Sequence, residues 1–154
     1  MLRKYSVVIA DTSCFILLDK IGKLSLLQDV FGTVATTKEV ASEFIKPLPY
    51  WVSIKSPNNV KFVQLLEMEV DKGEASAIAL ALEDDRPLLI LDDAKARKVA
   101  SNLNLDFTGT LGMLLKAKER GIIPLLKPLL EKIQQTNFRF SEKVFIDLLR
   151  EANE

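Results

Sequence analysis

Histidine is absent from the 154 residues of this chain, and cysteine occurs only once. The absence of histidine excludes Ser-His-Asp and Cys-His nucleophile systems, and it excludes zinc sites built on imidazole. A single cysteine can form neither a disulfide within the chain nor a thiolate zinc site. Any enzymatic chemistry would therefore depend on carboxylates, hydroxyls, lysines and arginines, and carboxylate ligands suit Mg²⁺ or Mn²⁺ better than zinc.

Net charge is also absent, because 21 Lys and Arg residues balance 21 Asp and Glu residues. Without a global basic field, a polyanionic partner would have to meet a local patch or a metal ion. No apolar run reaches the length of a membrane span, and Asp11 and Asp19 interrupt the first one, which argues against a secretory signal. These features predict a single cytoplasmic domain over residues 1–154 without a membrane partner.

Short apolar runs alternate with helical patterns along the chain. Strands are expected at SVVIAD, TVATT, PLLILDD and LDFTGT, with a weaker one at WVSIKS, and helices follow with stops at Gly22, Gly32 and Gly121. This alternation predicts an α/β fold of three layers, in which helices flank a central, mainly parallel sheet on both faces. Two amphipathic helices, at about 124–135 and 141–152, are expected to close the chain as a C-terminal extension (about 124–154) packed on the core.

Acidic residues follow two of the predicted strands. Asp11 comes directly after the first, and the pair Asp92 and Asp93 ends PLLILDD. Because the carboxyl ends of parallel strands share one edge of the sheet, these acids are expected to lie close together. Each also has a structural explanation: Asp11 could be a turn residue or a helix cap, and one of the paired aspartates could cap the next helix.

Three glutamates are further candidates. Glu74 opens a helix after Gly73, where its charge would also suit the helix dipole. Glu39 and Glu43 lie four residues apart on one helical face, a spacing also common among solvated side chains. Several carboxylates at one sheet edge would repel one another, and a bound divalent cation would relieve that repulsion. Such an ion would also support in-line hydrolysis of a phosphodiester.

Polar residues beside these acids are candidates for substrate contacts. Thr12 and Ser13 could hydrogen-bond a carboxylate or a metal-bound water, although Ser13 could equally cap the following helix. The lone Cys14 is expected to be a small buried residue, since no base is available to activate it. Basic residues follow the last of these acids at Lys95, Arg97 and Lys98, and the patch is extended later in the chain by Lys116, Lys118 and Arg120. This basic patch is either a solvated face or a set of phosphate contacts.

Five motifs together resemble the PIN domain, and most closely a prokaryotic branch related to the VapC-type toxins. In family order they are VVIADTSCFILLDKIGKLSLL, TTKEVASEF, KGEASAIALAL, LLILDDAKARKVA and FTGTLGMLLKAKERGIIP. The resemblance spans roughly residues 6–124, and the last two helices also resemble that branch. It implies a PIN fold and a metal-dependent ribonuclease in which a cluster of acids binds Mg²⁺ or Mn²⁺.

The resemblance also assigns expected roles to individual residues. The four acidic positions expected to be catalytic are Asp11, Glu43, Glu74 and Asp92, and Glu39 replaces Glu43 if the register of that helix differs. The expected metal ligands are Asp11, Glu74 and Asp92, with Asp93 as an auxiliary. The hydroxyl residues expected to line the site are Thr12, Ser13 and Thr110. Arg97, a member of the basic patch, is expected to contact the substrate.

Several functions remain open at this stage. The leading hypothesis is a metal-dependent endoribonuclease, with the toxin of a type II toxin–antitoxin pair as one role; an antitoxin and a second copy of the chain would then be its protein partners. The apolar faces of the last two helices would either pack on the core or form such an interface. The alternative is a PIN-fold module that binds RNA or a protein without cleavage, although all four acidic positions are filled. An aspartyl-phosphate enzyme is disfavoured because DTS lacks the second aspartate of a D-x-D signature, and no P-loop motif is present.

Overall fold

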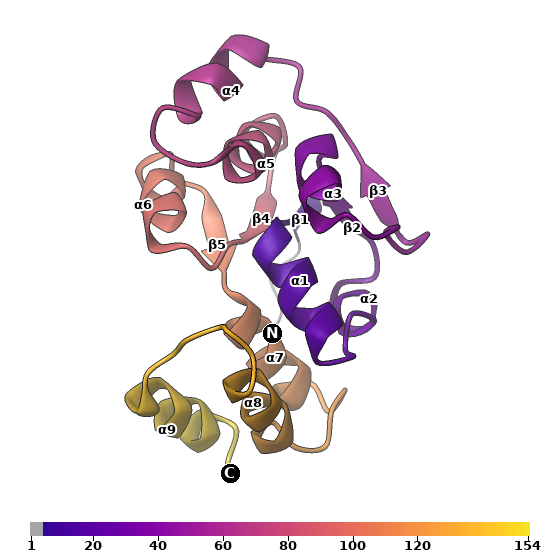
Figure 1. Ribbon diagram of the computed structural model, residues 1–154, viewed down its shortest axis with the longest axis vertical. Coiled ribbons are helices and arrows are strands. Elements are labelled where there is room, and N and C mark those ends of the chain that lie inside the picture. The colour runs from indigo at the N-terminus through magenta and orange to yellow at the C-terminus, as the bar shows by residue number, and fades with distance from the viewer. Residues whose placement is uncertain (1–4) are drawn as a thin grey trace.

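A five-stranded parallel sheet forms the centre of the molecule in the computed structural model, which describes residues 5–154 (Figure 1). The strands are β1 (Val7–Ala10), β2 (Val34–Thr36), β3 (Val52–Ile54), β4 (Pro87–Ile90) and β5 (Asp106–Thr108). Their spatial order is β3-β2-β1-β4-β5, and all neighbouring pairs are parallel. The chain builds outward from β1 through β2 to β3 and then returns to the other side of β1 with β4. The strand order therefore reverses between β1 and β4.

The two faces of the sheet carry separate apolar clusters, because successive side chains of a strand point to opposite sides. In β1, Val8 and Ala10 belong to one cluster and Ile9 to the other. Helices α1 (Thr12–Lys20), α2 (Leu26–Phe31) and α7 (Thr110–Glu119) contribute to the first cluster, and α5 (Lys72–Leu82) and α6 (Ala94–Asn102) to the second. This arrangement confirms the predicted three-layer α/β/α fold.

The remaining helices lie at the margins of these layers. Helix α3 (Lys38–Phe44) contacts both α1 and α5, and α4 (Val60–Leu66) contacts α5. Helices α8 (Lys127–Gln134) and α9 (Glu142–Glu151) gather with α7 at one end of the molecule (Figure 1). The two predicted C-terminal helices are thereby confirmed. The predicted single domain over 1–154 stays a prediction, and residues 1–4 lie outside the described part of the chain.

Local signals in the sequence account for most helix ends. Gly22, Gly32 and Gly121 follow α1, α2 and α7 with φ of 70°, 80° and 73°, in the left-handed region that glycine adopts without a Cβ penalty. Asn59 caps α4 by accepting the Phe62 N–H at 3.0 Å. Asp93 caps α6 by accepting the Ala96 N–H at 3.0 Å. The prediction that one of the paired aspartates is an N-cap is therefore confirmed.

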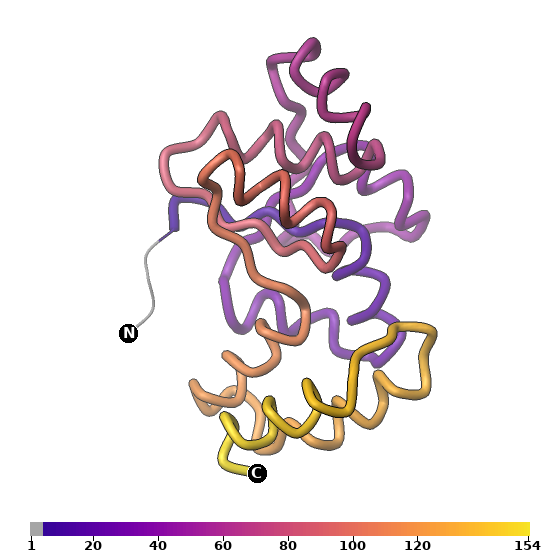
Figure 2. The backbone as a smooth tube through the Cα atoms, turned by 90° about the vertical axis from the view of Figure 1, so that its left-hand side faces the viewer, coloured from indigo at the N-terminus to yellow at the C-terminus, as the bar shows by residue number. Residues whose placement is uncertain are grey.

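Core packing accounts for most of the apolar residues in the C-terminal helices. The inward face of α8 is buried, whereas the apolar residues of α9 are half-buried or exposed. The segment between α8 and α9 passes beside α1 (Figure 2). There Lys20 Nζ donates to Asn137 Oδ1 at 2.8 Å. Among residues 5–154, no helix is long and apolar enough to cross a membrane.

Candidate active site

Asp11 lies at the carboxyl end of β1, at the point where the strand order reverses. Ala10 is paired with Ile90 of β4, and the Asp11 N–H donates to the Ile90 carbonyl at 3.2 Å. The residue directly after β1 is thereby placed next to the residues that follow β4. In open parallel sheets, ligands bind in the crevice outside the strand ends at such a reversal.

The Asp11 carboxyl is buried without being satisfied. It stands at the N-cap position of α1, yet its side chain makes no capping hydrogen bond. The residue is 4% exposed, and its Oδ1 has no hydrogen-bond partner. Burial raises the pKa of Asp11 to about 7, the hydrogen bond from the Thr12 N–H opposes this, and the charges of Glu74, Asp71 and Glu43 raise it further. A cap function does not explain this carboxyl, because it makes no capping hydrogen bond to the first turn of α1.

Glu74 is the second carboxyl with a strongly altered environment, and it begins α5. Asp71 Oδ1 accepts the Glu74 N–H at 2.8 Å, and Glu74 Oε1 accepts the Asp71 N–H at 3.2 Å, which makes a capping box. Burial and the neighbouring Asp71 charge raise the pKa of Glu74 to about 7, with smaller contributions from Asp93 and Glu43. The capping box gives Glu74 a structural role, and the raised pKa shows that its charge is poorly compensated.

Glu43 is joined to the other acids through the first residue of α1. Thr12 Oγ1 donates to Glu43 Oε1 at 2.5 Å. A Cβ at Gly73 would collide with Glu43 Oε1 and lie 3.2 Å from Thr12 Oγ1, so the start of α5 approaches both residues closely. A side chain at position 73 would therefore have to displace the Glu43 carboxylate. The starts of α1 and α5 and the end of α3 therefore converge, and Glu43, not Glu39, makes the contact to Thr12.

Asp92 lies after β4 and is bound by the first turn of α7. Its Oδ1 accepts the Thr110 N–H at 2.8 Å, and its Oδ2 accepts the Thr110 hydroxyl at 2.6 Å. Both contacts orient the carboxylate at the N-terminus of a helix, where negative charge is favoured. Asp93 is engaged as the cap of α6, and its charge contributes to the raised pKa of Glu74.

Arg97 closes the site on the α6 side. Its Nε donates to the Leu91 carbonyl at 2.7 Å, and its guanidinium carbon lies 5.5 Å from the centre of the Phe107 ring. A Cβ at Gly109 would collide with Arg97 Nη2 and lie 3.0 Å from Asp92 Oδ1. Gly109 therefore lets a cation and a carboxylate approach the same stretch of backbone.

A divalent cation at this site would need oxygen ligands from the carboxylate side chains. Among residues 5–154, no group of three or more carboxylate or thiol side chains is arranged to hold a metal ion. The donor set nevertheless fits a hard cation in its chemistry, since it consists of carboxylates and includes the buried, unpartnered Oδ1 of Asp11. A cation would also offset the repulsion that raises the pKa of both Asp11 and Glu74.

Asp71, Gly73 and Gly109 were not predicted as site residues, and the alternative that Ser13 caps the helix after the first strand is wrong. Asp71 was overlooked although the spacing D-x-x-E with Glu74 is a capping-box signal. Gly73 and Gly109 were overlooked because close approach depends on tertiary contacts. Ser13 is exposed within α1 and does not cap it. As expected, Cys14 is buried, and burial raises the pKa of its thiol.

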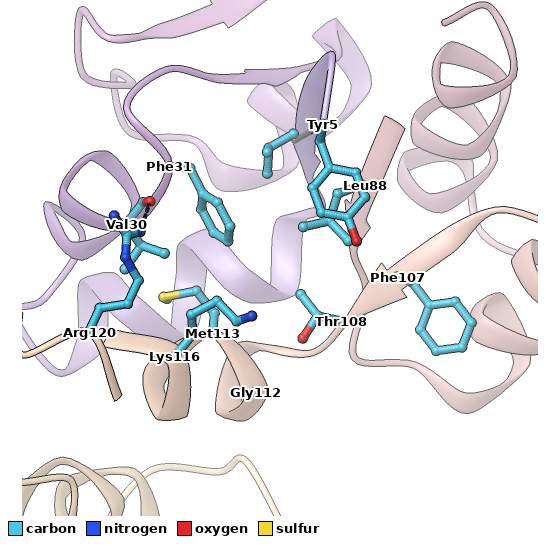
Figure 3. Close-up of a pocket in the computed structure, with 11 residues that line it drawn as sticks. Tyr5, Val30, Phe31, Leu88, Phe107, Thr108, Gly112, Met113, Lys116 and Arg120 are labelled. Carbon is cyan, nitrogen blue, oxygen red and sulfur yellow. Dashed lines mark hydrogen bonds between the residues drawn. The ribbon is translucent and has the colours of Figure 1, made fainter. Parts of the chain in front are cut away.

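Two neighbouring hollows share residues of β5 and α7. The larger, about 530 Å³, contains the basic residues Lys116 and Arg120 and no carboxylate among its lining residues, so it cannot supply the acidic chemistry (Figure 3). The second, about 450 Å³, includes Asp92 and Arg97 and opens toward the segment between α8 and α9. Phe107 belongs to both, and its ring points away from the other side chains of the larger hollow (Figure 3).

Comparison with protein families gave one finding that bears on this site. A family model described as PIN domain matches residues 7–154. A comparison with curated proteins gave no match. PIN domains are in general nucleases that act on nucleic acids and use divalent metal ions.

Proposed function

The chain belongs to the PIN domain family, and on this premise we propose that it is a metal-dependent endoribonuclease that hydrolyses RNA phosphodiester bonds. The observation that carries the proposal is the Asp11 carboxyl, buried at the reversal of strand order with an unpartnered oxygen. Glu74 and Glu43 raise its pKa further, and Asp92 follows the adjacent strand. Buried, uncompensated carboxylates of this kind occur at functional sites.

In this proposal, Asp11, Glu74 and Asp92, with Asp93 as an auxiliary, would hold Mg²⁺ or Mn²⁺. Such an ion, when bound, polarises a phosphoryl oxygen and lowers the pKa of a coordinated water. Thr12 keeps Glu43 oriented through its 2.5 Å hydrogen bond, and Thr110 keeps Asp92 oriented through two contacts. Glu43 is exposed and free of a capping role, which suits it to accept a proton from the attacking water.

A cleavage assay tests this proposal. Purified protein is incubated with structured and single-stranded RNA in Mn²⁺, and EDTA is added in a parallel reaction. We expect cleavage in Mn²⁺ only, with a loss of at least about 100-fold in Asp11→Asn and Asp92→Asn. Asp29→Asn is the matched control, because Asp29 is an exposed aspartate of α2 and should leave the rate unchanged. RNA binding without cleavage by the unaltered protein would instead favour the binding module.

The toxin role is a narrower form of the same proposal, supported by the resemblance to VapC-type toxins. In this role the protein acts as a homodimer in the cytoplasm, and an antitoxin blocks it. Induced expression in a bacterial host should arrest growth, and the Asp11→Asn variant should not. Normal growth on expression of a protein that is active in vitro would contradict the toxin role and leave the nuclease proposal intact.

A further inference from the structure

The larger of the two hollows, which we call the α2–α7 pocket, lies apart from the acids. It lies on the sheet face that carries the first apolar cluster, between the end of α2 and the middle of α7. Val8 and Leu88 are paired in the sheet and both line the pocket. Asp11 and Asp92 follow them by three and four positions, a separation of about 10–13 Å along the strands. The pocket is therefore distinct from the acidic site.

The floor of the α2–α7 pocket is apolar. Four of its lining residues are buried apolar side chains: Val8, Val30, Leu88 and Met113. The half-buried rings of Phe31 and Tyr5 stand beside them (Figure 3). Among the described residues that line the pocket, none is Asn, Gln, Asp or Glu, so the polar edges of a nucleobase would be left without partners. The pocket therefore suits a hydrocarbon body better than a base, and its volume of about 530 Å³ is in the range of small-ligand sites, about 300–1,000 Å³.

Two cations stand at the edge of this apolar floor. Lys116 and Arg120 are four residues apart on α7 and share one helical face, where like charges repel. Arg120 Nη1 donates to the Val30 carbonyl at 2.6 Å, which holds the guanidinium beside the pocket. In the part of the chain that the structure describes, no carboxylate forms an ion pair with either cation. An anion in the pocket would supply the missing negative charge.

A hydroxyl near Lys116 provides a second donor for such an anion. Thr108 Oγ1 is 3.5 Å from the Gly109 carbonyl, which is too long for a strong hydrogen bond. The half-buried Lys116 side chain points toward Thr108 (Figure 3). We propose that the α2–α7 pocket binds a small carboxylate with a hydrocarbon body, its carboxyl group between Lys116 and Thr108 and its chain on the apolar floor. Binding requires neither a metal ion nor RNA, so the proposal is independent of the ribonuclease function.

A titration with octanoate tests the pocket. Octanamide has the same body without the charge, inorganic phosphate has charge without the body, and adenosine monophosphate carries a base in place of the chain. Each compound is added in EDTA to the full ¹⁵N-labelled chain, and the shifts of the amide resonances report both position and affinity. We expect octanoate to shift the amides of Phe31, Gly112 and Lys116 with a Kd of about 1 mM, the affinity of a ligand of this size. It should bind at least about fivefold more tightly than the other three compounds.

A variant of Lys116 tests the role of the charge. Lys116→Met keeps a long apolar side chain and removes the ammonium group, so octanoate should bind at least about fivefold more weakly and octanamide about as before. Lys132→Met is the matched control, because Lys132 is exposed on α8 and does not line the pocket. It should change the affinity for octanoate by less than about twofold.

Several outcomes would overturn the proposal. Equal losses in the two variants would exclude Lys116 as the anion contact, and equal affinity for octanoate and octanamide would exclude a need for the charge. Phosphate that binds as tightly as octanoate would show that the apolar floor contributes nothing. Tighter binding of adenosine monophosphate at the same amides would identify a nucleotide site instead. Octanoate that leaves these amides unshifted at about ten times the expected Kd would exclude a site for a carboxylate of this kind.

Discussion

At the scale of single residues, Asp11 connects stability with the proposed function. Its side chain is buried, makes no capping hydrogen bond and leaves Oδ1 without a partner. Burial of an ionised carboxyl costs free energy unless a hydrogen bond or an opposite charge compensates for it. Asp11 receives one compensating hydrogen bond, from the Thr12 N–H, and the charged groups near it are acids. Asp11 therefore lowers the stability of the metal-free protein, and a bound cation would offset this cost.

The first prediction is that the metal-free protein loses stability as pH rises from about 4 to about 7. Burial raises the pKa of Asp11 from its ordinary value of 3.8 to about 7, and Glu74 also titrates near 7. Between these values the folded state binds more protons than the unfolded state, so the free energy of unfolding falls with rising pH. For Asp11 the slope is at most about 1.4 kcal/mol per pH unit. Urea unfolding in EDTA at several pH values measures it.

The control for this prediction is Asp11→Asn. Its free energy of unfolding should fall less steeply with rising pH, because the amide does not titrate. Added Mn²⁺ should stabilise the unaltered protein at pH 8 and have little effect at pH 5, where protons occupy the same oxygens. An identical pH profile in both proteins would contradict the role assigned to Asp11.

The second prediction concerns Gly109. A Cβ there would meet Arg97 Nη2 and lie 3.0 Å from Asp92 Oδ1, so Gly109→Ala should displace the guanidinium and disturb the carboxylate. We expect a loss of RNA affinity and of Mn²⁺-dependent cleavage of about tenfold, with a small change in Tm, because the arginine can move outward. Gly112→Ala, whose Cβ would meet the Thr108 hydroxyl, is the comparison and should affect cleavage less.

At the scale of elements, the beginnings of helices place the acids. Helix α5 begins at the Asp71–Glu74 capping box, α6 begins at Asp93, and α7 begins where Thr110 binds Asp92. A buried chain of hydroxyls joins α3 to α5, since Thr37 Oγ1 and Ser76 Oγ are 2.7 Å apart and Ser76 donates to the Gly73 carbonyl. These contacts fix the position of α5, and with it Glu74, relative to the sheet.

The third prediction separates capping from catalysis. Asp71→Ala removes the side-chain cap of α5 and Asn59→Ala removes that of α4, and each should cost about 1 kcal/mol of stability. Only Asp71→Ala should also change cleavage, because it leaves the Glu74 N–H without its side-chain acceptor and removes a charge that raises the pKa of Asp11 and Glu74. Denaturant unfolding and the Mn²⁺ cleavage assay give the two readouts. Equal activity in both variants would show that α5 capping does not position Glu74.

At the scale of the whole molecule, the C-terminal helices are joined to the fold by Glu154. Its carboxylate accepts the Leu126 and Lys127 N–H groups at 2.6 and 3.0 Å, and Lys118 Nζ donates to it at 3.1 Å. It thereby caps α8 and links the end of α9 to α7. Because residues 138–148 form one wall of the hollow of about 450 Å³ that includes Asp92 and Arg97, this link also bears on that hollow.

The fourth prediction is that Glu154→Gln lowers the Tm by about 2–4 °C, the shift expected for about 1 kcal/mol in a chain of this size. The amide keeps the shape and loses the charge that favours a helix N-terminus and a lysine partner. Glu151→Gln, at an exposed position of α9, should leave the Tm within about 1 °C. Scanning fluorimetry of both variants at pH 7 makes the comparison, and equal shifts would exclude the link.

Much of the fold was predictable from the sequence because its signals are local. Buried strands such as PLLILDD, helical spacing, and glycines at helix ends depend on residues close together in the chain, and the structure confirms the elements they predict. The position of Asp11 and Asp92 after strands was local as well, and parallel strand ends necessarily share an edge. The sequence by itself thus determined the three-layer fold and the edge at which the acids lie.

Tertiary structure alone decided what each acid does there. Which carboxyl is capping, bound or unsatisfied depends on partners far away in the chain, such as Thr12 for Glu43 across 31 positions. The sequence did not decide which of Asp92 and Asp93 caps the next helix; in the folded chain Asp93 is the cap of α6, and Asp92 is bound by Thr110 of α7. The order of strands sets these contacts, and periodicity does not encode strand order. For the same reason the hollow that Arg97 shares with residues 138–148 could be found only in the folded chain.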